Sequence, residues 1–555
     1  MDEQTEVVGG GAPAWMADTV GPLLLEYLLN CDSVAVQAIL AGECSPSAEQ
    51  LRVMEALSAR RAALSKDLGE AGVREAVRHW LLQVGNDGRS TAGTLRTLTC
   101  RETSLAPPSA DEMERTFAAL ARAVYTAFLI PTETIPIHGM PELADLLEEV
   151  DQRIPNLIAS LSDGAAFIAA VAADESVGKV FRGAHATLGA YAAVYLNTGH
   201  GGPVFLKHLP VLMLRATWRQ VRDAEPTEER FVTEALAQLA IVRRVLGGRT
   251  SKVRAKLAFT GVLMPADACI DLGDDGVVRP VTDADRRYAP GALEQRVGGA
   301  ADAEGARTYI SYAGDVVLDY PYRYKAWIPG PSHDVTAWQE RVPEPVELDQ
   351  VILWLRASLI LAVEREHRAH IVQTWRHIND PLAEGIGISW SDPRWGRGLT
   401  PVQLTEAEVV AWGEWYRLLR ASQAKRIELA ITRVLKAVAE RREPSDVLID
   451  SVIAWENIFG TAEGEPTFRV TACLSKLLAD SLAERRTRRR ELTDIYKLRS
   501  AVVHGNRSLT NADFAQCDRA LDVAIDAIRT LVDKRPDLLA EGDGGSRSTA
   551  VLLAD

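Results

Sequence analysis

The stretch from Leu492 to Val503 constrains the fold more than any other part of this sequence. Its apolar residues Leu492, Ile495, Tyr496 and Val503 fall at helical spacing, which places them on one side of an α-helix that must pack against a partner helix. Arg499 falls on the same stripe, where a charged side chain is costly without a partner or a ligand. The stretch therefore predicts a helix of a bundle that carries a functional arginine.

Polar residues and a glycine mark the end of this predicted helix. Four residues separate Arg499 from His504, Ser500 adjoins the arginine, and Gly505 follows the histidine. Ser500 and His504 share a helix face, and Arg499 lies about 100–140° around the axis. An imidazole transfers protons near neutral pH, and a guanidinium holds phosphate oxygens by paired hydrogen bonds. Gly505 predicts the helix end, and the set as a whole indicates RNA cleavage.

Two upstream segments extend the pattern. Residues 446–459, 468–478 and 496–505 resemble, in this order, the acidic helix, the next helix and the catalytic helix of the HEPN superfamily, most closely of its Apea-like branch. The resemblance covers residues 400–540 approximately. It implies a helical endoribonuclease that needs neither metal nor cofactor, in which the ribose 2′-OH attacks its own phosphate and leaves a cyclic phosphate.

The resemblance also implies roles for five side chains. Arg499 holds the phosphate, His504 moves the proton, and Ser500 completes the catalytic set or orients the histidine; Glu456 and Tyr496 support them. The family's cleft typically forms where two copies of the catalytic helix meet, so a homodimer with a composite active site is expected. In HEPN members that serve as assembly domains, the same residues would only make packing hydrogen bonds.

An arginine-rich run precedes the motif. Residues 484–507 hold eight Lys or Arg against three acids, whereas the whole chain has 62 basic and 76 acidic residues and a net charge of −14. An RNA must therefore be met by a local patch, for which the run is the best candidate; the alternative is an ordinary solvated helix face. The predicted RNA-binding residues are Arg485, Arg486, Arg488, Arg489, Arg490, Lys497 and Arg507.

Composition frames the other regions. A hydrophobic content of 47% over 555 residues, no apolar run of spanning length, no signal-peptide pattern and six cysteines without close pairing indicate a cytoplasmic, bacterial protein with no membrane segment. We expect a mainly α, multidomain fold with a helix-turn-helix-like domain at 15–105, a helical bundle at 108–250, a small antiparallel β-rich domain at 252–345, a helical region at 346–540 containing the HEPN-like bundle, and a flexible tail at 541–555.

The N-terminal region, residues 15–105, is similar to small Xre-like helix-turn-helix domains of bacterial antitoxins and regulators. A DNA reader needs basic residues for phosphate contacts. Residues 31–50 contain none, against Asp32, Glu43 and Glu49. A protein-contact or structural role is therefore favoured over DNA binding.

Two clusters leave alternatives open. The tyrosines between Tyr309 and Trp327 stack on unpaired bases or form a sheet core, and the core is favoured. His367, His370 and His377 are expected on successive turns of a long helix, where they form a metal site or an exposed polar face. The face is favoured because the spacing is not a defined zinc pattern.

The sequence thus predicts a regulated endoribonuclease, a toxin or antiphage defence effector, whose upstream domains restrain it until a regulatory ligand, a phage component or a partner protein acts. The alternative is a non-catalytic DNA- or protein-binding regulator that uses the HEPN-like domain for dimerisation.

Overall fold

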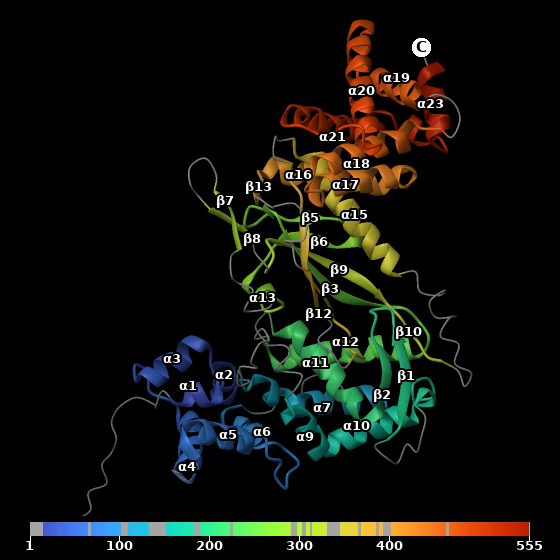
Figure 1. Ribbon diagram of the computed structural model, residues 1–555. Helices are drawn as coiled ribbons and strands as arrows, with labels where there is room; N and C mark the ends of the chain where they lie inside the picture. Colours follow the sequence, from blue (N-terminus) through green and yellow to red (C-terminus); the bar gives the residue numbers. More distant parts are fainter. Residues whose placement is uncertain are drawn as a thin grey trace, which may run out of the picture. The chain divides into compact units, whose positions relative to one another are not determined.

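The chain divides into two compact units (Figure 1). The first comprises Met1–Val253, Arg323–Arg341 and Asn379–Gly387, and the second comprises Arg254–Tyr322, Val342–Ile378 and Ile388–Asp555. The computed structural model describes residues 15–64, 68–100, 109–131, 151–181, 189–222, 226–289, 297–301, 307–310, 313–329, 344–364, 368–383, 388–391, 401–461 and 466–553. The expected mainly α, multidomain fold is confirmed, although each unit collects segments that are far apart in the sequence.

Short helices open the first unit. Asp32, Ser47 and Ser90 each start one of them by accepting a hydrogen bond from the backbone N–H three residues later, which satisfies a donor that the helix itself cannot pair. These helices agree with the helical domain expected at the N-terminus, whose role stays a prediction. They are α1 (Trp15–Val20), α2 (Pro22–Leu29), α3 (Ser33–Ala41), α4 (Ala48–Ala62), α5 (Gly69–Leu81) and α6 (Thr91–Thr99).

The remainder of the first unit combines helices with a three-stranded sheet of order β10-β1-β2. The purely helical bundle predicted for 108–250 is wrong here, because β1 and β2 form a hairpin around the glycine-rich segment. Gly201 is required in it, since an added Cβ would lie 2.7 Å from the ring of Tyr195. The elements are α7 (Glu112–Leu129), α9 (Arg153–Ser160), α10 (Ser162–Ala173), β1 (Tyr191–Leu196), β2 (Gly201–Phe205), α11 (Leu209–Val221), α12 (Glu228–Leu246) and β10 (Ala326–Trp327).

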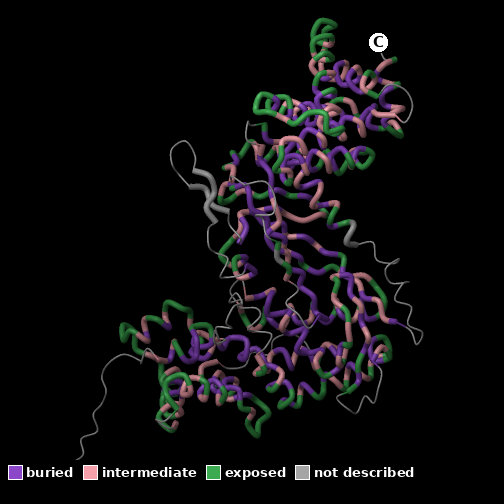
Figure 2. The backbone as a smooth tube through the Cα atoms, viewed as in Figure 1, coloured by how far each residue is buried: buried purple, intermediate pink, exposed green. Residues whose placement is uncertain are grey.

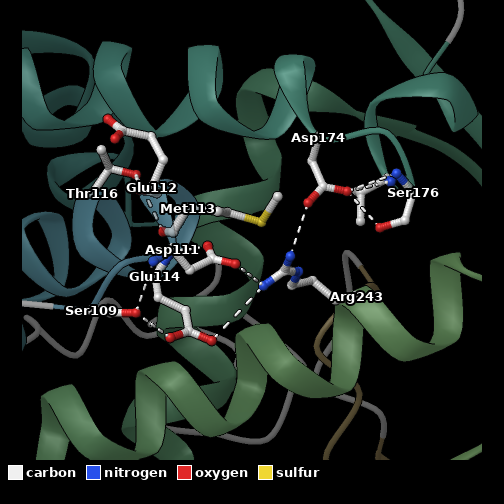
Figure 3. Close-up of polar contacts among 10 residues, drawn as sticks. Ser109, Asp111, Glu112, Met113, Glu114, Thr116, Asp174, Ser176 and Arg243 are labelled. Atoms are coloured by element: carbon white, nitrogen blue, oxygen red, sulfur yellow. Dashed lines mark hydrogen bonds and ion pairs between the residues drawn. The ribbon is translucent and has the colours of Figure 1, made fainter.

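Arg243 of α12 connects the start of α7 to the end of α10 (Figure 3). Its Nη1 lies 2.7 Å from Asp111 Oδ2, and its Nη2 lies 2.9 Å from Asp174 Oδ2. Asp111 also caps α7, and Asp174 accepts hydrogen bonds from the backbone of Ser176 and Val177. Burial raises the pKa of both carboxyl groups, but these hydrogen bonds and the guanidinium outweigh it and lower both pKa values.

A six-stranded sheet of order β12-β11-β3-β9-β6-β5 provides the core of the second unit. Ala258, Tyr288, Val317 and Trp375 form a buried cluster on it, and the Trp375 indole donates to the carbonyl of Ala313 at 2.9 Å. The strands of this sheet are β3 (Ser251–Thr260), β5 (Ile270–Asp271), β6 (Val277–Pro280), β9 (Val316–Tyr324), β11 (Val372–Ile378) and β12 (Ile388–Trp390). Two separate two-stranded sheets are formed by β4 (Val262–Leu263) with β13 (Val402–Gln403) and by β7 (Val297–Ala301) with β8 (Arg307–Ile310).

Two expectations for this region need correction. The sheet is larger than the predicted β domain, because β11 and β12 come from the segment expected to be helical. The long histidine-bearing helix is wrong: His377 lies in β11, where it is buried and stacks on Tyr288, and His370 is buried just before that strand. His367 lies outside the described residues.

The predicted tyrosine core is supported by the part of that cluster which the structure describes. Tyr320, Tyr322 and Tyr324 are all buried in β9. Tyr309 and Tyr312 have no described side chains.

Helices complete the second unit. Helix α18 lies at the centre of the C-terminal group and contacts α17, α19, α20, α21 and α23, whereas Figure 2 shows much of α20 as exposed. The helices are α13 (Asp283–Arg286), α15 (Glu344–Ala362), α16 (Glu406–Ala421), α17 (Glu428–Ala439), α18 (Pro444–Phe459), α19 (Pro466–Leu477), α20 (Leu482–Val503), α21 (Phe514–Arg529), α22 (Pro536–Leu539) and α23 (Gly544–Leu553).

The flexible tail expected at 541–555 is wrong over Gly544–Leu553, which forms α23. Arg547 is 1% exposed and donates from Nε to the Ile458 carbonyl at 2.8 Å and from Nη2 to the Asn457 carbonyl at 3.1 Å. These carbonyls belong to the last turn of α18, where a helix leaves acceptors unpaired. The arginine satisfies them and fixes α23 in place.

Within the described ranges, no single helix has the length and apolar character needed to cross a bilayer. Two bent pairs, Pro22–Leu29 with Ser33–Ala41 and Arg153–Ser160 with Ser162–Ala173, meet the length and composition criteria only when each pair is taken together.

Replacing the central arginine of Figure 3 should destabilise the first unit. We expect Arg243→Met to lower the free energy of unfolding at pH 7 by about 1–2 kcal/mol, because two carboxylates lose a charged hydrogen-bond donor. Both folded-state pKa values are lowered, so this stabilisation is present above the unfolded pKa of about 4 and is lost as pH falls below it.

Denaturant titration at pH 7 and at pH 3 measures the effect. The difference between wild type and Arg243→Met should shrink at pH 3. Arg230→Met, at an exposed position of the same helix, is the matched control and should change neither value. An Arg243→Met variant as stable as the control at pH 7 would contradict the proposed role.

Candidate functional site

The predicted site residues lie on two neighbouring helices of the second unit: the supporting Glu456 on α18, and Tyr496, Arg499 and Ser500 on α20, with His504 as the C-terminal cap of α20. Ser481 and Glu484 start α20 with reciprocal hydrogen bonds, the capping box. The helix then runs without interruption to Val503. Its buried residues include Leu492, Ile495 and Tyr496, so this part of the predicted apolar stripe faces the bundle. Val503, also expected on the stripe, lies in the last turn of the helix and is 47% exposed.

The end of α20 is set by the backbone alone. His504 is the C-terminal cap; the N–H of Gly505 bonds to the Val502 carbonyl at 3.1 Å, and that of Asn506 bonds to the Ala501 carbonyl at 2.9 Å. Gly505 has φ +69°, the left-handed conformation that favours glycine in this motif. The predicted helix end at Gly505 is confirmed, and the turn presents His504 as an exposed side chain.

Glu456, Tyr496 and Arg499 form a small polar group between α18 and α20. The Tyr496 hydroxyl donates to Glu456 Oε1 at 2.5 Å, and Arg499 Nη2 lies 3.8 Å from Glu456 Oε2. Burial, reinforced by the hydrogen bond and the charge of Glu456, raises the pKa of Tyr496 to about 12. The tyrosine therefore stays protonated at neutral pH and orients the carboxylate, and the carboxylate in turn holds the arginine.

Arg499 keeps hydrogen-bonding capacity in reserve. Its side chain is 21% exposed and that of Glu456 is 30% exposed. The Nε atom of Arg499 is buried and has no hydrogen-bond partner among the described residues. Buried donors are nearly always paired, so an unpaired Nε is unusual. Because the contact to Glu456 is also long, at 3.8 Å, the guanidinium is able to bind a further anionic partner.

Ser500 and His504 stand apart from this group. Within the described part of the chain, no hydrogen bond or ion pair joins either side chain to Glu456, Tyr496 or Arg499. Because five positions separate Arg499 from His504, the two side chains diverge by about 140° around α20 and are offset by about 7.5 Å along it. One copy of the helix therefore presents the guanidinium and the imidazole on different faces.

The arginine run of α20 is short of counter-charges. Among the described residues, no carboxylate lies within ion-pair distance of its five arginines, although Arg485 bonds to the Ala479 carbonyl at 2.8 Å and Arg490 to the Arg486 carbonyl at 3.3 Å. The five are Arg485, Arg486, Arg488, Arg489 and Arg490.

The two other predicted RNA-binding residues do have acidic neighbours. Lys497 Nζ lies 3.4 Å from Asp494, and Arg507 contacts Asp513. The positive potential of this surface therefore comes chiefly from residues 485–490.

Phe468, the third residue of α19, was not among the predicted site residues. The Arg489 guanidinium lies 4.2 Å from the centre of its ring, and the side chain is 49% exposed. A phenylalanine in a helix with apolar periodicity is ordinarily a core residue. Only its position beside an arginine-rich helix distinguishes Phe468 as a candidate site residue.

Metal ligation finds no support in the described ranges, where no group of three or more His, Cys, Asp or Glu side chains could hold an ion. The chain matches no protein-family model, no curated protein and no solved structure. The resemblance to HEPN domains therefore stays a prediction, and the site is interpreted from its own geometry.

The polar group predicts a change in the titration of Tyr496. We expect Glu456→Gln to lower the Tyr496 pKa below about 12, yet to leave it above the ordinary value of about 10, because burial remains. NMR of tyrosine-labelled protein titrated from pH 8 to about pH 12, so that the range reaches the wild-type pKa, measures it, with Tyr496→Phe to assign the signal. Glu491→Gln, which removes a carboxylate paired with Arg519 instead, is the control. Equal titration of Tyr496 in both variants would disprove the contact.

The helix end predicts a local stability effect. Gly505→Ala should lower the free energy of unfolding of the second unit by about 1 kcal/mol, because alanine resists the left-handed conformation. Open space surrounds the position, so no clash adds to this cost. Gly542→Ala is the matched control, since that glycine also has open space but no positive φ. Denaturant titration compares them, and equal stabilities would contradict the argument.

Proposed function

We propose that the C-terminal helices form a metal-independent endoribonuclease of HEPN type. The observation that carries the proposal is Arg499, an arginine held by Glu456 and Tyr496 yet left with a buried, unsatisfied donor. It lies on the helix that ends at an exposed His504 and that carries five arginines with no described carboxylate within ion-pair distance, although Arg488 interacts electrostatically with Glu484 and Asp526. A guanidinium, an imidazole and a basic approach surface are the groups that phosphate-ester cleavage requires without a metal.

The proposed reaction uses the RNA's own nucleophile. His504 accepts the proton of a ribose 2′-OH, whose oxygen attacks the adjacent phosphorus. Arg499 stabilises the negative charge on the phosphate oxygens as it develops. The bond to the 5′-oxygen of the next nucleotide breaks, that oxygen takes up a proton, and the products are a 2′,3′-cyclic phosphate and a 5′-hydroxyl. Ser500 shares the face of His504 and serves to orient it.

A homodimer would explain why Arg499 and His504 project from different faces of α20. Because about 140° separates Arg499 from His504 within one helix, a cleft that holds both is most readily made by the arginine of one copy and the histidine of the other. A two-fold pairing supplies two such combinations. The protonated His504 then returns its proton to the leaving 5′-oxygen.

The same proposal makes the protein a regulated toxin or antiphage defence effector. The first unit and the six-stranded sheet far exceed what the chemistry requires, which supports a sensing role for a ligand, phage component or partner protein. The alternative function is a non-catalytic DNA- or protein-binding regulator. A negative result in the following tests would favour it.

Substitution of His504 should abolish cleavage. We expect purified wild-type protein to cut RNA in EDTA and to yield 2′,3′-cyclic phosphate ends, and His504→Ala to lower kcat about 10²–10⁴-fold through loss of proton transfer. Gel assays with mass spectrometry of the ends measure both. His79→Ala, at an exposed histidine of α5, is the matched control and should cut as wild type. Equal cleavage by His504→Ala and wild type would refute the assignment.

Mixing two inactive variants tests the composite cleft. Arg499→Ala and His504→Ala should each be inactive, while dimers re-formed from an equal mixture should recover about a quarter of wild-type activity, since half are mixed and each mixed dimer has one intact combination of two. Size-exclusion chromatography with light scattering confirms dimer formation. No recovery in mixed dimers would place both residues of each site in one chain.

A further inference from the structure

One face of α20, exposed at four of its six positions and half-buried at Thr493 and Ser500, joins the arginine run to the catalytic histidine. Six of its residues follow one another at alternating intervals of four and three positions, a spacing that keeps them on one side of a helix. The buried residues Leu492, Ile495 and Leu498 lie on other sides. The six residues, called here the polar track, are Arg486, Arg490, Thr493, Lys497, Ser500 and His504.

An aromatic ring flanks the beginning of the polar track. Phe468 of α19 is half-exposed, and Arg489, next to the track, lies over it. Helices α19 and α20 pack directly against each other, so the ring is held beside the arginines by the fold. An exposed ring beside cations is the combination that proteins use to stack an unpaired base while they hold its phosphates.

The geometry points to a binding path for single-stranded RNA along the polar track, anchored by one base at Phe468. This inference rests on the proposed function and specifies its substrate class. Arg486, Arg489 and Arg490 bind phosphates on either side of the stacked base, and Lys497 and Ser500 guide the strand toward His504. A base in a duplex has both faces covered by its neighbours, so only an unpaired one reaches the ring.

The length of the path sets where the strand is cut. His504 lies fifteen positions after Arg489 in the sequence, which corresponds to about 22 Å along the helix at 1.5 Å per residue. A strand stacked at about 3.4 Å per nucleotide spans this in about six nucleotides, and a more extended strand in fewer. Cleavage therefore falls a few nucleotides from the anchored base, and shorter RNAs lose the anchor.

Charge favours RNA over other occupants. The whole chain carries −14, yet none of the five arginines at 485–490 has an ion-paired carboxylate among the described residues, while nearby Arg519 and Arg507 do. A polyanion compensates the arginines that the fold leaves unpaired. An acidic peptide offers charge but no base for Phe468.

Binding without chemistry is the first test. Full-length His504→Ala protein, folded by circular dichroism, is titrated by fluorescence anisotropy with a labelled single-stranded RNA of about twelve nucleotides and with its duplex. The single strand should bind at least about tenfold more tightly than the duplex. Adding Phe468→Ala or Phe468→Leu should weaken binding about tenfold, whereas Phe468→Trp should retain it.

Two further variants separate stacking from charge and from surface apolarity. Arg486→Gln should lower the slope of log K against log salt by about 0.7, the value for one phosphate of a single strand. Leu429→Ala removes an apolar side chain that is 47% exposed on α17, away from the track, and should leave affinity and slope unchanged.

Cleavage of a length series is the second test. Substrates with one cleavable linkage carry from about two to about twelve further nucleotides on one side, then on the other. In wild type, kcat/KM should rise once the extension reaches the length of the path. Phe468→Leu should lose that rise, and the side on which the rise occurs gives the strand direction.

The outcomes are distinguishable. Phe468-dependent binding of single strands supports the path whether or not the wild type, which its upstream domains are proposed to restrain, cleaves RNA. Cleavage with Phe468 variants that bind and cut as wild type refutes the path and leaves the nuclease. Equal binding of the duplex, or binding of neither RNA, refutes the path as well.

Discussion

The burial of α18 is the constraint on which the C-terminal bundle depends. Its neighbours cover it on nearly every side, so each of its polar groups needs a protein partner. The Trp455 indole donates to the Ala520 carbonyl at 3.1 Å, and Asp450, 2% exposed, accepts from Arg433 and Arg441 at 2.8 and 2.6 Å. Each of these bonds ties a surrounding helix or its end to α18.

Glu456 is a carboxylate of α18 that the bundle leaves partly open, with 30% of its side chain exposed. It meets Tyr496 and Arg499 on α20, and a carboxylate deprived of such partners costs several kcal/mol, about 3–5 when it is fully buried. The same contact therefore positions α20 and presents Arg499. Glu456 thus serves the packing of α20 and, under the proposed function, the placement of Arg499, since the guanidinium is fixed by its terminal nitrogen while its Nε stays unsatisfied.

Much of the bundle could be predicted because its signals are local. The apolar stripe and Gly505 specify the end of α20 but not its start, since the helix begins at Leu482, ten residues before the stripe. The acidic position of the upstream helix indicates Glu456. Strand β11 was missed because Val372–Ile378 mixes aromatic and charged residues without clear alternation, and its pairing with β3, far back in the chain, decides its conformation. Helix α23 was missed because a Gly- and Ser-rich start reads as a tail, whereas Arg547 ties it to α18.

Phe468 shows a different limit. Periodicity assigns it to an amphipathic helix but cannot say how far the ring is covered, since that depends on the angle at which α19 meets α20. The charge of α20 shows the same limit. The number of arginines can be read from the sequence, but only the fold shows that the nearby acids Glu491 and Asp494 pair with Arg519 and Lys497 instead.

The turn at Gly505 fixes the backbone of His504 and leaves its imidazole without a hydrogen bond among the described residues. The ring thus retains the rotational freedom of a surface side chain. Ordering such a side chain costs about 0.5–1.5 kcal/mol. Under the proposed dimeric arrangement, this cost is met only when His504 contacts substrate or a second copy, so the imidazole is present in every chain but ordered only in the complex.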